Sequence, residues 1–113
     1  MSFNLPELPY AHDSLSSLGM SKETLEFHHD IHHKAYVDNG NKLLSESEHQ
    51  GKSLEEIITS TYDSSSVAQS GLFNNASQHW NHTQFWEMMG PKGREMPPEL
   101  ESRLKENFGS VED

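Results

Sequence analysis

The stretch EFHHDIHHKAYV, residues 26–37, organises this chain. Its four histidines form two pairs with a spacing of four residues, His28 with His32 and His29 with His33. Four residues advance an α-helix by about 400°, so each pair lies on one stripe of the helix surface. Tyr36 continues the first stripe, and one face of the predicted helix therefore presents two imidazoles and a phenol in a row.

This histidine-rich face has two interpretations on the stretch alone. Imidazole is the commonest metal ligand in proteins, which favours a metal site. A dense run of histidines can also be a solvated polar face or a tag-like sequence. The run is internal, Asp30 and Ile31 interrupt it, and apolar residues interleave at helical spacing, which argues against a tag. Of the two interpretations, we therefore favour a metal site over a solvated face.

The composition restricts the class of protein and the kind of metal site. A length of 113 residues fits one small domain or a part of a larger one. Only 32% of the residues are hydrophobic, so we do not expect a self-sufficient core. The absence of cysteine excludes disulfides, thiolate metal sites and cysteine nucleophiles, so any metal must be held by His, Asp or Glu.

The charge and the hydropathy pattern restrict the classes of partner that the protein can bind. A formal net charge of -10 argues against nucleic acid as a partner. No apolar run approaches the length of a signal segment or a membrane span. We therefore expect no membrane partner, and we predict an untargeted, cytoplasmic protein.

The segment 1–18 is predicted to be an extended arm. Pro6 and Pro9 each restrict their own φ angle and bias the preceding residue away from helix. Tyr10 and Leu15 are the residues expected to anchor the arm to a core.

Capping residues predict where the next helices begin. Ser21 is a good N-cap for a first helix over residues 21–44, in which Gly40 is a weak point where the helix could bend. Ser53 and Glu56 form a capping box that opens a second, short helix. The small and polar residues 61–71 predict a loop.

A third helix is predicted over residues 72–89, where Gly90 and Pro91 stop it. Its apolar side chains predict a mostly buried helix, packed against the first in an antiparallel hairpin: Phe73, Ala76, Trp80, Phe85, Trp86 and Met89. Gln78 and His82 are four residues apart and share a stripe. Buried polar groups cost about 1–3 kcal/mol each if unpaired, so a cluster among aromatics needs a shared partner, which a metal would supply.

The C-terminal part predicts a connector over residues 91–98 and then a fourth helix. Leu100, Leu104 and Phe108 recur at helical spacing, and Gly109 is the expected stop. Residues 110–113 have the pattern of an N-cap and the first turn of a further helix. We therefore expect the chain to be part of a longer protein.

At this point the chain resembles the iron/manganese superoxide dismutase family. Four segments carry the resemblance: LPELPYAHDSL at 5–15, EFHHDIHHKAYV at 26–37, GKSLEEII at 51–58 and FNNASQHWNHTQFW at 73–86. The resemblance covers essentially the whole chain, and FGSVED at the end is similar to the family segment after the interdomain linker. The family's Asp-x-Trp-Glu-His motif and any strand pattern are absent from the sequence.

The resemblance implies a fold in two parts. Residues 1–90 would be the all-α, antiparallel helical hairpin that forms the N-terminal domain of an α + α/β two-domain enzyme. Residues 91–113 would be the linker and the first helix of the second domain, which is mostly absent.

The resemblance also implies roles for five side chains. His28 and His82 would be two of the four protein ligands of the metal, the other two being an Asp and a His outside this sequence. Tyr36 would be the gateway phenol of the substrate funnel, and His32 the second funnel residue, which touches the partner subunit in the family. Gln78 would hydrogen-bond to the metal-bound solvent.

The implied activity is the disproportionation of superoxide to dioxygen and hydrogen peroxide at a mononuclear metal site, an antioxidant function. Gln78 and Trp80 are iron-type, whereas His79 is typical of manganese types, so iron is expected, with manganese or cambialistic use as alternatives. Trp80 and Trp86 resemble aromatics of the shell around the metal. A homodimer or tetramer is expected for the whole protein, and the isolated 113-residue chain is predicted to be inactive.

Two other functions stay open beside the dismutase. One is a non-catalytic helical hairpin that binds a divalent metal through its histidines. The other is a structural hairpin whose histidines are solvated. Gln78, Tyr36 and the aromatic shell favour the dismutase, because a sequestering site needs none of them. His29 has no implied role and is expected to be a surface histidine, as are His12 and His49.

Overall fold

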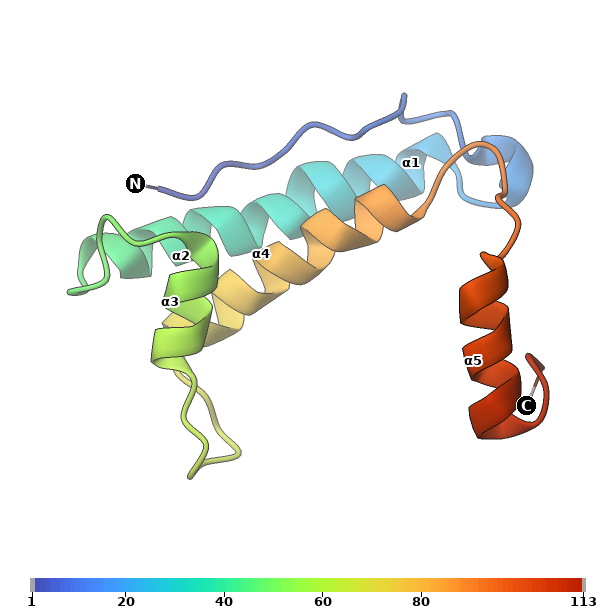
Figure 1. The fold of residues 1–113 in the computed structure, drawn as a ribbon. Helices are drawn as coiled ribbons and strands as arrows, with labels where there is room; N and C mark the ends of the chain where they lie inside the picture. The colour runs from blue at the N-terminus through green and yellow to red at the C-terminus, as the bar shows by residue number, and fades with distance from the viewer. Residues whose placement is uncertain (1, 113) are drawn as a thin grey trace.

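A computed structural model describes residues 2–112, and within that range every regular element is helical. In chain order the elements are η1 (Ser16–Leu18), α1 (Lys22–Leu25), η2 (Glu26–His33), α2 (Lys34–Ser45), α3 (Leu54–Thr61), α4 (Gly71–Met88) and α5 (Pro98–Phe108). Elements α1, η2 and α2 follow one another without a break and form one long helix, which runs antiparallel to α4 (Figure 1). The predicted all-α helical hairpin is confirmed.

The long helix begins where its capping residue predicts. The Thr24 N–H donates to the Ser21 hydroxyl over 3.1 Å, and the helix ends at Ser45, so the prediction of 21–44 was correct to within one residue. The middle of this helix, η2, is π-helical: the Lys34 N–H donates to the carbonyl of His29, five residues earlier. A π-type turn holds more residues than an α turn.

The π-helical turns keep one stripe of the long helix directed inward. In a regular α-helix a spacing of four drifts by about 40° per step. The wider turns of η2 offset that drift, so residues with a constant spacing of four stay buried. These buried residues are Leu25, His29, His33 and Val37.

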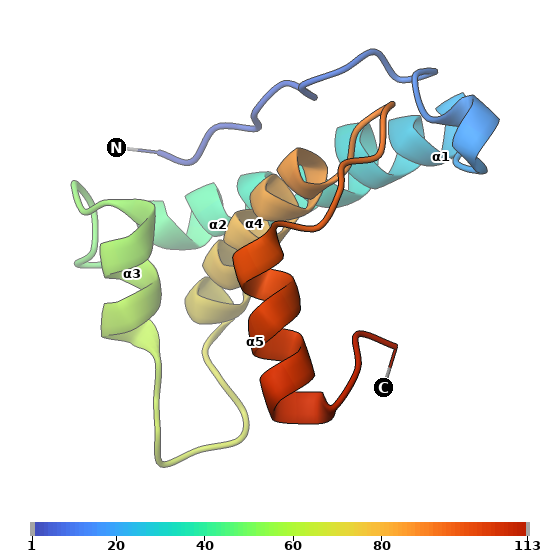
Figure 2. The same cartoon turned by 45° about the vertical axis from the view of Figure 1, so that its right-hand side comes forward.

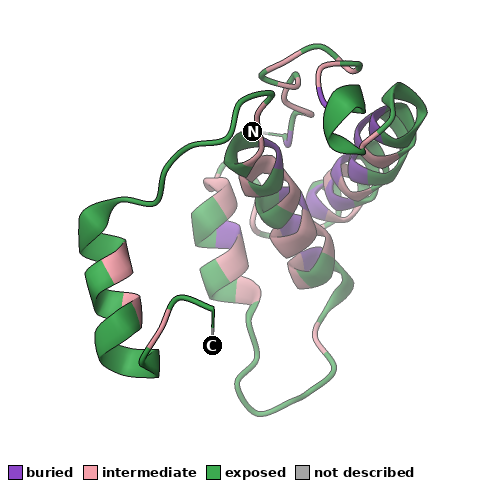
Figure 3. Cartoon of the chain, turned by 90° about the vertical axis from the view of Figure 1, so that its right-hand side faces the viewer, coloured by how far each residue is buried: buried purple, intermediate pink, exposed green. Residues whose placement is uncertain are grey.

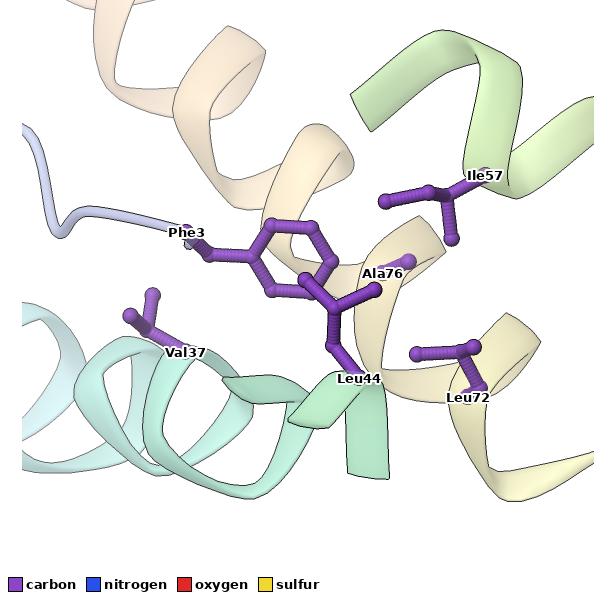
Figure 4. Close-up of a cluster of buried hydrophobic side chains, with 6 residues drawn as sticks. All are labelled: Phe3, Val37, Leu44, Ile57, Leu72 and Ala76. Carbon is purple, nitrogen blue, oxygen red and sulfur yellow. The ribbon is translucent and has the colours of Figure 1, made fainter. Parts of the chain in front are cut away.

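Gly40 makes room for the N-terminal arm, and the predicted bend at Gly40 is wrong. The long helix continues through this position to Ser45. A Cβ at Gly40 would lie 2.7 Å from Cε2 of Phe3, so only glycine lets the ring approach the helix this closely. The Phe3 N–H donates to the Asn41 Oδ1 over 2.6 Å, and the Asn41 amide donates back to the Phe3 carbonyl over 2.9 Å. The ring lies at the centre of one core cluster (Figure 4).

The arm is anchored a second time near the other end of the hairpin, as the sequence predicts. The Tyr10 hydroxyl donates to the main-chain oxygen of Trp86 over 3.1 Å. Leu15 is 3% exposed and forms a second core cluster with Leu25 and Trp86. The arm therefore runs along the long helix (Figure 1), and its Pro6 carbonyl accepts a hydrogen bond from His29 of the inward stripe.

The short helix α3 begins with the predicted capping box. The Glu56 N–H donates to the Ser53 hydroxyl over 3.2 Å, and the Ser53 N–H donates to the Glu56 carboxylate over 2.7 Å. Ile57 of α3 is fully buried and packs in the first core cluster with Leu72 and Ala76 of α4. The predicted loop before α4 is confirmed, since residues 62–70 form no helix.

The prediction that residues 72–89 are mostly buried is wrong for two of the large side chains. Trp86 and Ala76 are buried, but Trp80 is 39% exposed and Phe85 is 37% exposed. Helix α4 packs on α2, α3 and η2, and it still carries exposed residues between the buried ones (Figure 3).

The last helix, α5, stands away from the hairpin and carries no buried residue (Figure 2). It begins at Pro98 and ends at Phe108, and the predicted stop Gly109 follows with a positive φ of 85°, which favours glycine. The further helix predicted at 110–113 is not formed by residues 110–112, and Asp113 lies outside the described residues. None of the helices in the range 2–112 is long and apolar enough to cross a membrane.

Candidate metal centre

Three histidines from the two antiparallel helices of the hairpin lie close together. The ring centroids of His28 and His82 lie 5.1 Å apart, those of His32 and His82 5.2 Å, and those of His28 and His32 5.4 Å. One ring nitrogen of each residue lies within 4.8 Å of the other two. The antiparallel packing therefore brings His28 and His82 side by side, as the hairpin predicted.

A main-chain hydrogen bond selects the tautomer of His82. Its Nδ1 lies 2.7 Å from the carbonyl oxygen of Gln78, one turn earlier in α4. A carbonyl oxygen can only accept, so Nδ1 carries the proton, which leaves Nε2 with a free lone pair. Histidines that bind metals commonly donate their other N–H in this way, which fixes the ring orientation.

The surroundings of His28 keep its ring in the neutral form that binds metals. Burial lowers the pKa of His28, and the neighbouring His82 and His32 lower it further. Its ring also meets the edge of the Trp86 indole, with centroids 4.8 Å apart, and Phe85 at 5.4 Å. Neutral imidazoles are ligands that suit iron, zinc, copper and nickel. Among the described residues this cluster contains no carboxylate.

Tyr36 completes the stripe predicted from the sequence. Its ring lies 5.0 Å from that of His32 and 5.3 Å from that of His82. His28, Asn81, His82 and Phe85 also line a shallow cavity of about 220 Å³. A small molecule can therefore reach the histidines from the surface.

Gln78 and Trp80 lie on the same helix as His82 but differ in their relation to the cluster. Gln78 is half-buried, and its main-chain oxygen accepts the bond from His82. Its side-chain amide has no hydrogen-bond partner within residues 2–112. The Trp80 ring makes no contact with the three histidine rings in the described part of the chain, whereas Trp86 contacts both His28 and His82.

A second set of histidines, His33 and His79, is buried and hydrogen-bonded within the core. The Trp86 indole N–H donates to Nδ1 of His33 over 2.9 Å, and Nε2 of His33 lies 2.8 Å from Nδ1 of His79. An indole N–H can only donate, so the His33 proton is on Nε2 and points at His79. Burial above all lowers the pKa of His33 to about 3, and burial also lowers the pKa of His79.

The expectation that His29 lies on the surface is wrong, because it belongs to the inward stripe and is 6% exposed. Its Nε2 donates to the carbonyl of Pro6 over 2.6 Å, and its Nδ1 lies 2.6 Å from Oδ1 of Asp30. That bond from His29 is the main reason why the pKa of Asp30 is lowered. His12 and His49 are half-buried, near the surface as expected. The burial of His29 and His33 also rules out a hairpin in which all four histidines are solvated.

The roles of His33 and His79 were missed at the level of sequence, although a pattern pointed to His33. Leu25 and Val37 lie four residues before His29 and four after His33, so the apolar ends of that stripe indicated an inward face. No local pattern indicates the partners, because His79 and Trp86 lie 46 and 53 residues further along the chain.

The chain is similar to known proteins over almost its whole length. Residues 2–90 match the family described as iron/manganese superoxide dismutases, alpha-hairpin domain. The chain is 70% identical to a superoxide dismutase (Fe) of Rhodobacter capsulatus over 98% of this chain and 56% of that protein. It is 46% identical to a superoxide dismutase (Mn) of Rhizobium meliloti, over 99% and 54% respectively. A superoxide dismutase (Fe) of Escherichia coli strain K12 is 44% identical, over 100% and 55%. The chain spans about half the length of the curated relatives that it matches.

Proposed function

The chain belongs to the iron/manganese superoxide dismutase family, and we propose that it contributes half of the metal site of an enzyme that disproportionates superoxide. The products would be dioxygen and hydrogen peroxide. The observation that carries this proposal is the pairing of His28 with His82, whose rings lie 5.1 Å apart on antiparallel helices. His82 is held in the tautomer that leaves Nε2 free for a metal.

His28 and His82 would hold the ion as two of its protein ligands. A bound iron supplies the one-electron redox chemistry, with manganese or cambialistic use as the alternative. Both relatives named after iron and a relative named after manganese match this chain, so the similarity leaves the choice between the metals open. The ring of His28 is kept neutral, which keeps its lone pair available.

Tyr36, His32 and Gln78 would act on substrate and protons around that ion. Tyr36 and His32 lie next to His82 and carry groups that can donate or accept a proton at the mouth of the site. The Gln78 amide has no hydrogen-bond partner within residues 2–112, and we propose that it would donate to a small ligand on the ion. We assign these three side chains to access and tuning, and not to holding the ion.

The proposal includes a division of the chain at residue 90. Residues 1–90 would form the hairpin domain, and residues 91–113 the linker and the first helix of a second domain. That domain would supply the two remaining protein ligands, one Asp and one His. We further propose a homodimer or tetramer in the cytoplasm with an antioxidant role. Two histidine ligands bind an ion weakly, so the isolated 113-residue chain should show no appreciable dismutase activity.

A second candidate function rests on the three-histidine cluster itself. His28, His32 and His82 lie close enough to bind one divalent ion without any other domain. The hairpin alone could then act as a non-catalytic metal-binding module. Dismutase activity of the isolated chain and of the natural protein, each loaded with iron or manganese and compared with free ion, separates the two functions.

The sharpest test of the proposed enzyme is Gln78→Leu in the natural full-length protein. The variant should keep its metal, since the amide is not a ligand, but its activity should fall at least tenfold, because groups around the ligands tune a metal site. His82→Ala should lose metal and activity together. His49→Ala, a half-buried histidine elsewhere, is the matched control and should change neither. A parallel loss of metal and activity in Gln78→Leu would assign that residue a structural role.

A further inference from the structure

A second group of metal-binding side chains lies where the N-terminal arm crosses η2. It consists of His12, His29 and Asp30, whose ligand atoms all lie within 4.8 Å of one another. The Oδ1 atom of Asp30 is 2.6 Å from Nδ1 of His29 and 3.1 Å from Nε2 of His12. Two imidazoles thus share one carboxylate oxygen, and none of these residues belongs to the cluster around His82.

The hydrogen bond to the arm sets which nitrogen of His29 faces the group. Its Nε2 lies 2.6 Å from the carbonyl oxygen of Pro6, which can only accept, so Nε2 carries a proton. A ring that donates one N–H to a main-chain carbonyl presents its other nitrogen in the orientation typical of metal-binding histidines. In His29 that other nitrogen is Nδ1, which points at Asp30 and His12.

The hydrogen bond between His29 and Asp30 holds a proton at a place where a metal ion could lie instead. The carboxylate oxygen of Asp30 can only accept, and Nδ1 of His29 offers a lone pair unless it is protonated. At 2.6 Å, two lone pairs repel each other unless a proton or a metal ion lies between them. His12 brings a second imidazole nitrogen to the same oxygen, so two nitrogens and one oxygen that can bind a cation lie together.

We propose that His12, His29 and Asp30 form a second metal site that binds Zn²⁺. Two imidazoles and one carboxylate, with water as the fourth ligand, are a common tetrahedral zinc set. Ligand atoms bound to one zinc at ~2.0–2.1 Å lie ~3.3 Å apart in a tetrahedron. The observed separations of 2.6 and 3.1 Å therefore need to open by less than about 1 Å. His12 and Asp30 can supply that movement, because their side chains are 35% and 46% exposed.

The proposed ion would join the arm to the long helix. His12 belongs to the arm, and Pro6 already binds His29 from the arm, so a zinc ion would close a second link between the two segments. His29 precedes Asp30 on η2 and follows His28 directly, so the ion would stiffen the segment that carries the proposed redox ligand. The site would link two segments of the chain and would not take part in the proposed dismutase reaction.

The test is zinc uptake by the natural full-length protein already loaded with iron. Equilibrium dialysis and elemental analysis should find one zinc ion per chain in addition to the iron. His12→Ala and Asp30→Asn should each weaken this uptake at least tenfold, and both positions are exposed enough for the variants to fold. His49→Ala is the control and should bind like the wild type. An absence of the additional zinc up to millimolar concentration, or unchanged uptake in His12→Ala, would overturn the proposal.

A second variant separates this site from the three-histidine cluster. His82→Ala should keep the additional zinc, and cobalt bound in place of zinc should show a tetrahedral visible spectrum that His12→Ala removes. If His82→Ala abolishes the uptake and His12→Ala leaves it intact, the zinc lies beside His28 and the proposal is wrong. Dismutase activity of the iron form plays no part in this readout, so a failure here leaves the proposed function untouched.

Discussion

The two histidine stripes of the long helix are equal in composition but differ in their surroundings. His28 and His32 face His82 across the hairpin, and their ring nitrogens are within reach of a shared ion. His29 and His33 face inward, and each has hydrogen-bond partners on both ring nitrogens. We call His28 and His32 the open stripe, and His29 and His33 the closed stripe. The comparison shows that the surroundings of the histidines, and not their number, decide which stripe can hold the proposed redox metal.

The closed stripe owes its burial to the backbone. The π-helical turns of η2 hold His29 and His33 in line with Leu25 and Val37. Buried polar groups are tolerated only when they are paired. The closed stripe should therefore contribute to folding, whereas the open stripe should contribute to binding the proposed redox metal.

The largest effect that this comparison predicts is that of His33→Leu. The change keeps a similar volume but leaves the Trp86 N–H and Nδ1 of His79 unpaired in the core, which should lower the free energy of unfolding by about 3 kcal/mol. His32→Ala, on the open stripe, should change the free energy of unfolding by less than about 0.5 kcal/mol in the metal-free protein. Denaturant titration of both metal-free variants measures the difference. Equal losses of stability in the two variants would mean that the closed stripe contributes no more to folding than the open stripe.

A smaller effect is expected from acid. The pKa of His33 in the folded protein, about 3, lies below its ordinary value of 6.5, so the unfolded chain takes up a proton first as the pH falls. The stability that neutral His33 contributes is complete above pH 6.5 and is lost progressively toward pH 3. Between pH 7 and pH 5 this amounts to about 2 kcal/mol. The loss should be absent from His33→Leu, and an identical pH dependence in that variant would exclude His33 as its source.

The smallest of the three effects is expected at Gly40, where the closed stripe meets the arm. Alanine usually stabilises a helix relative to glycine, but here its Cβ would lie 2.7 Å from the Phe3 ring. We expect Gly40→Ala to lower the free energy of unfolding by about 1–2 kcal/mol through overpacking. Gly93→Ala is the control, because a Cβ at Gly93 meets no atom within 4 Å. A stabilised Gly40→Ala would show that the arm moves aside freely.

The sequence predicted the fold through local rules that act within one turn. Ser21 and Ser53 marked the beginnings of helices because their side chains cap the N–H groups three residues on. The spacing of His28 and His32, and the helical hairpin, predicted the open stripe. The fit of Phe3 on Gly40 and the bonds of His33 could not be predicted, because each depends on partners far away in the sequence.

The exposure of α4 was misjudged for a related reason. Its apolar side chains indicated a buried helix, but burial depends on how many neighbours cover it. In the described chain α2, α3 and η2 pack on α4, and Trp80 and Phe85 stay partly exposed. The apolar composition predicted that α4 packs against other elements, but it could not predict which elements these are.

The most direct test of the division between the stripes is the position of iron in crystals of the natural full-length protein. Anomalous scattering at the iron absorption edge locates the ion independently of any assumption about its ligands. Our account predicts a peak within about 2.2 Å of a ring nitrogen of both His28 and His82, with His33 still bound to Trp86 and His79. An iron peak beside His29 or His33, or none beside His82, would contradict it.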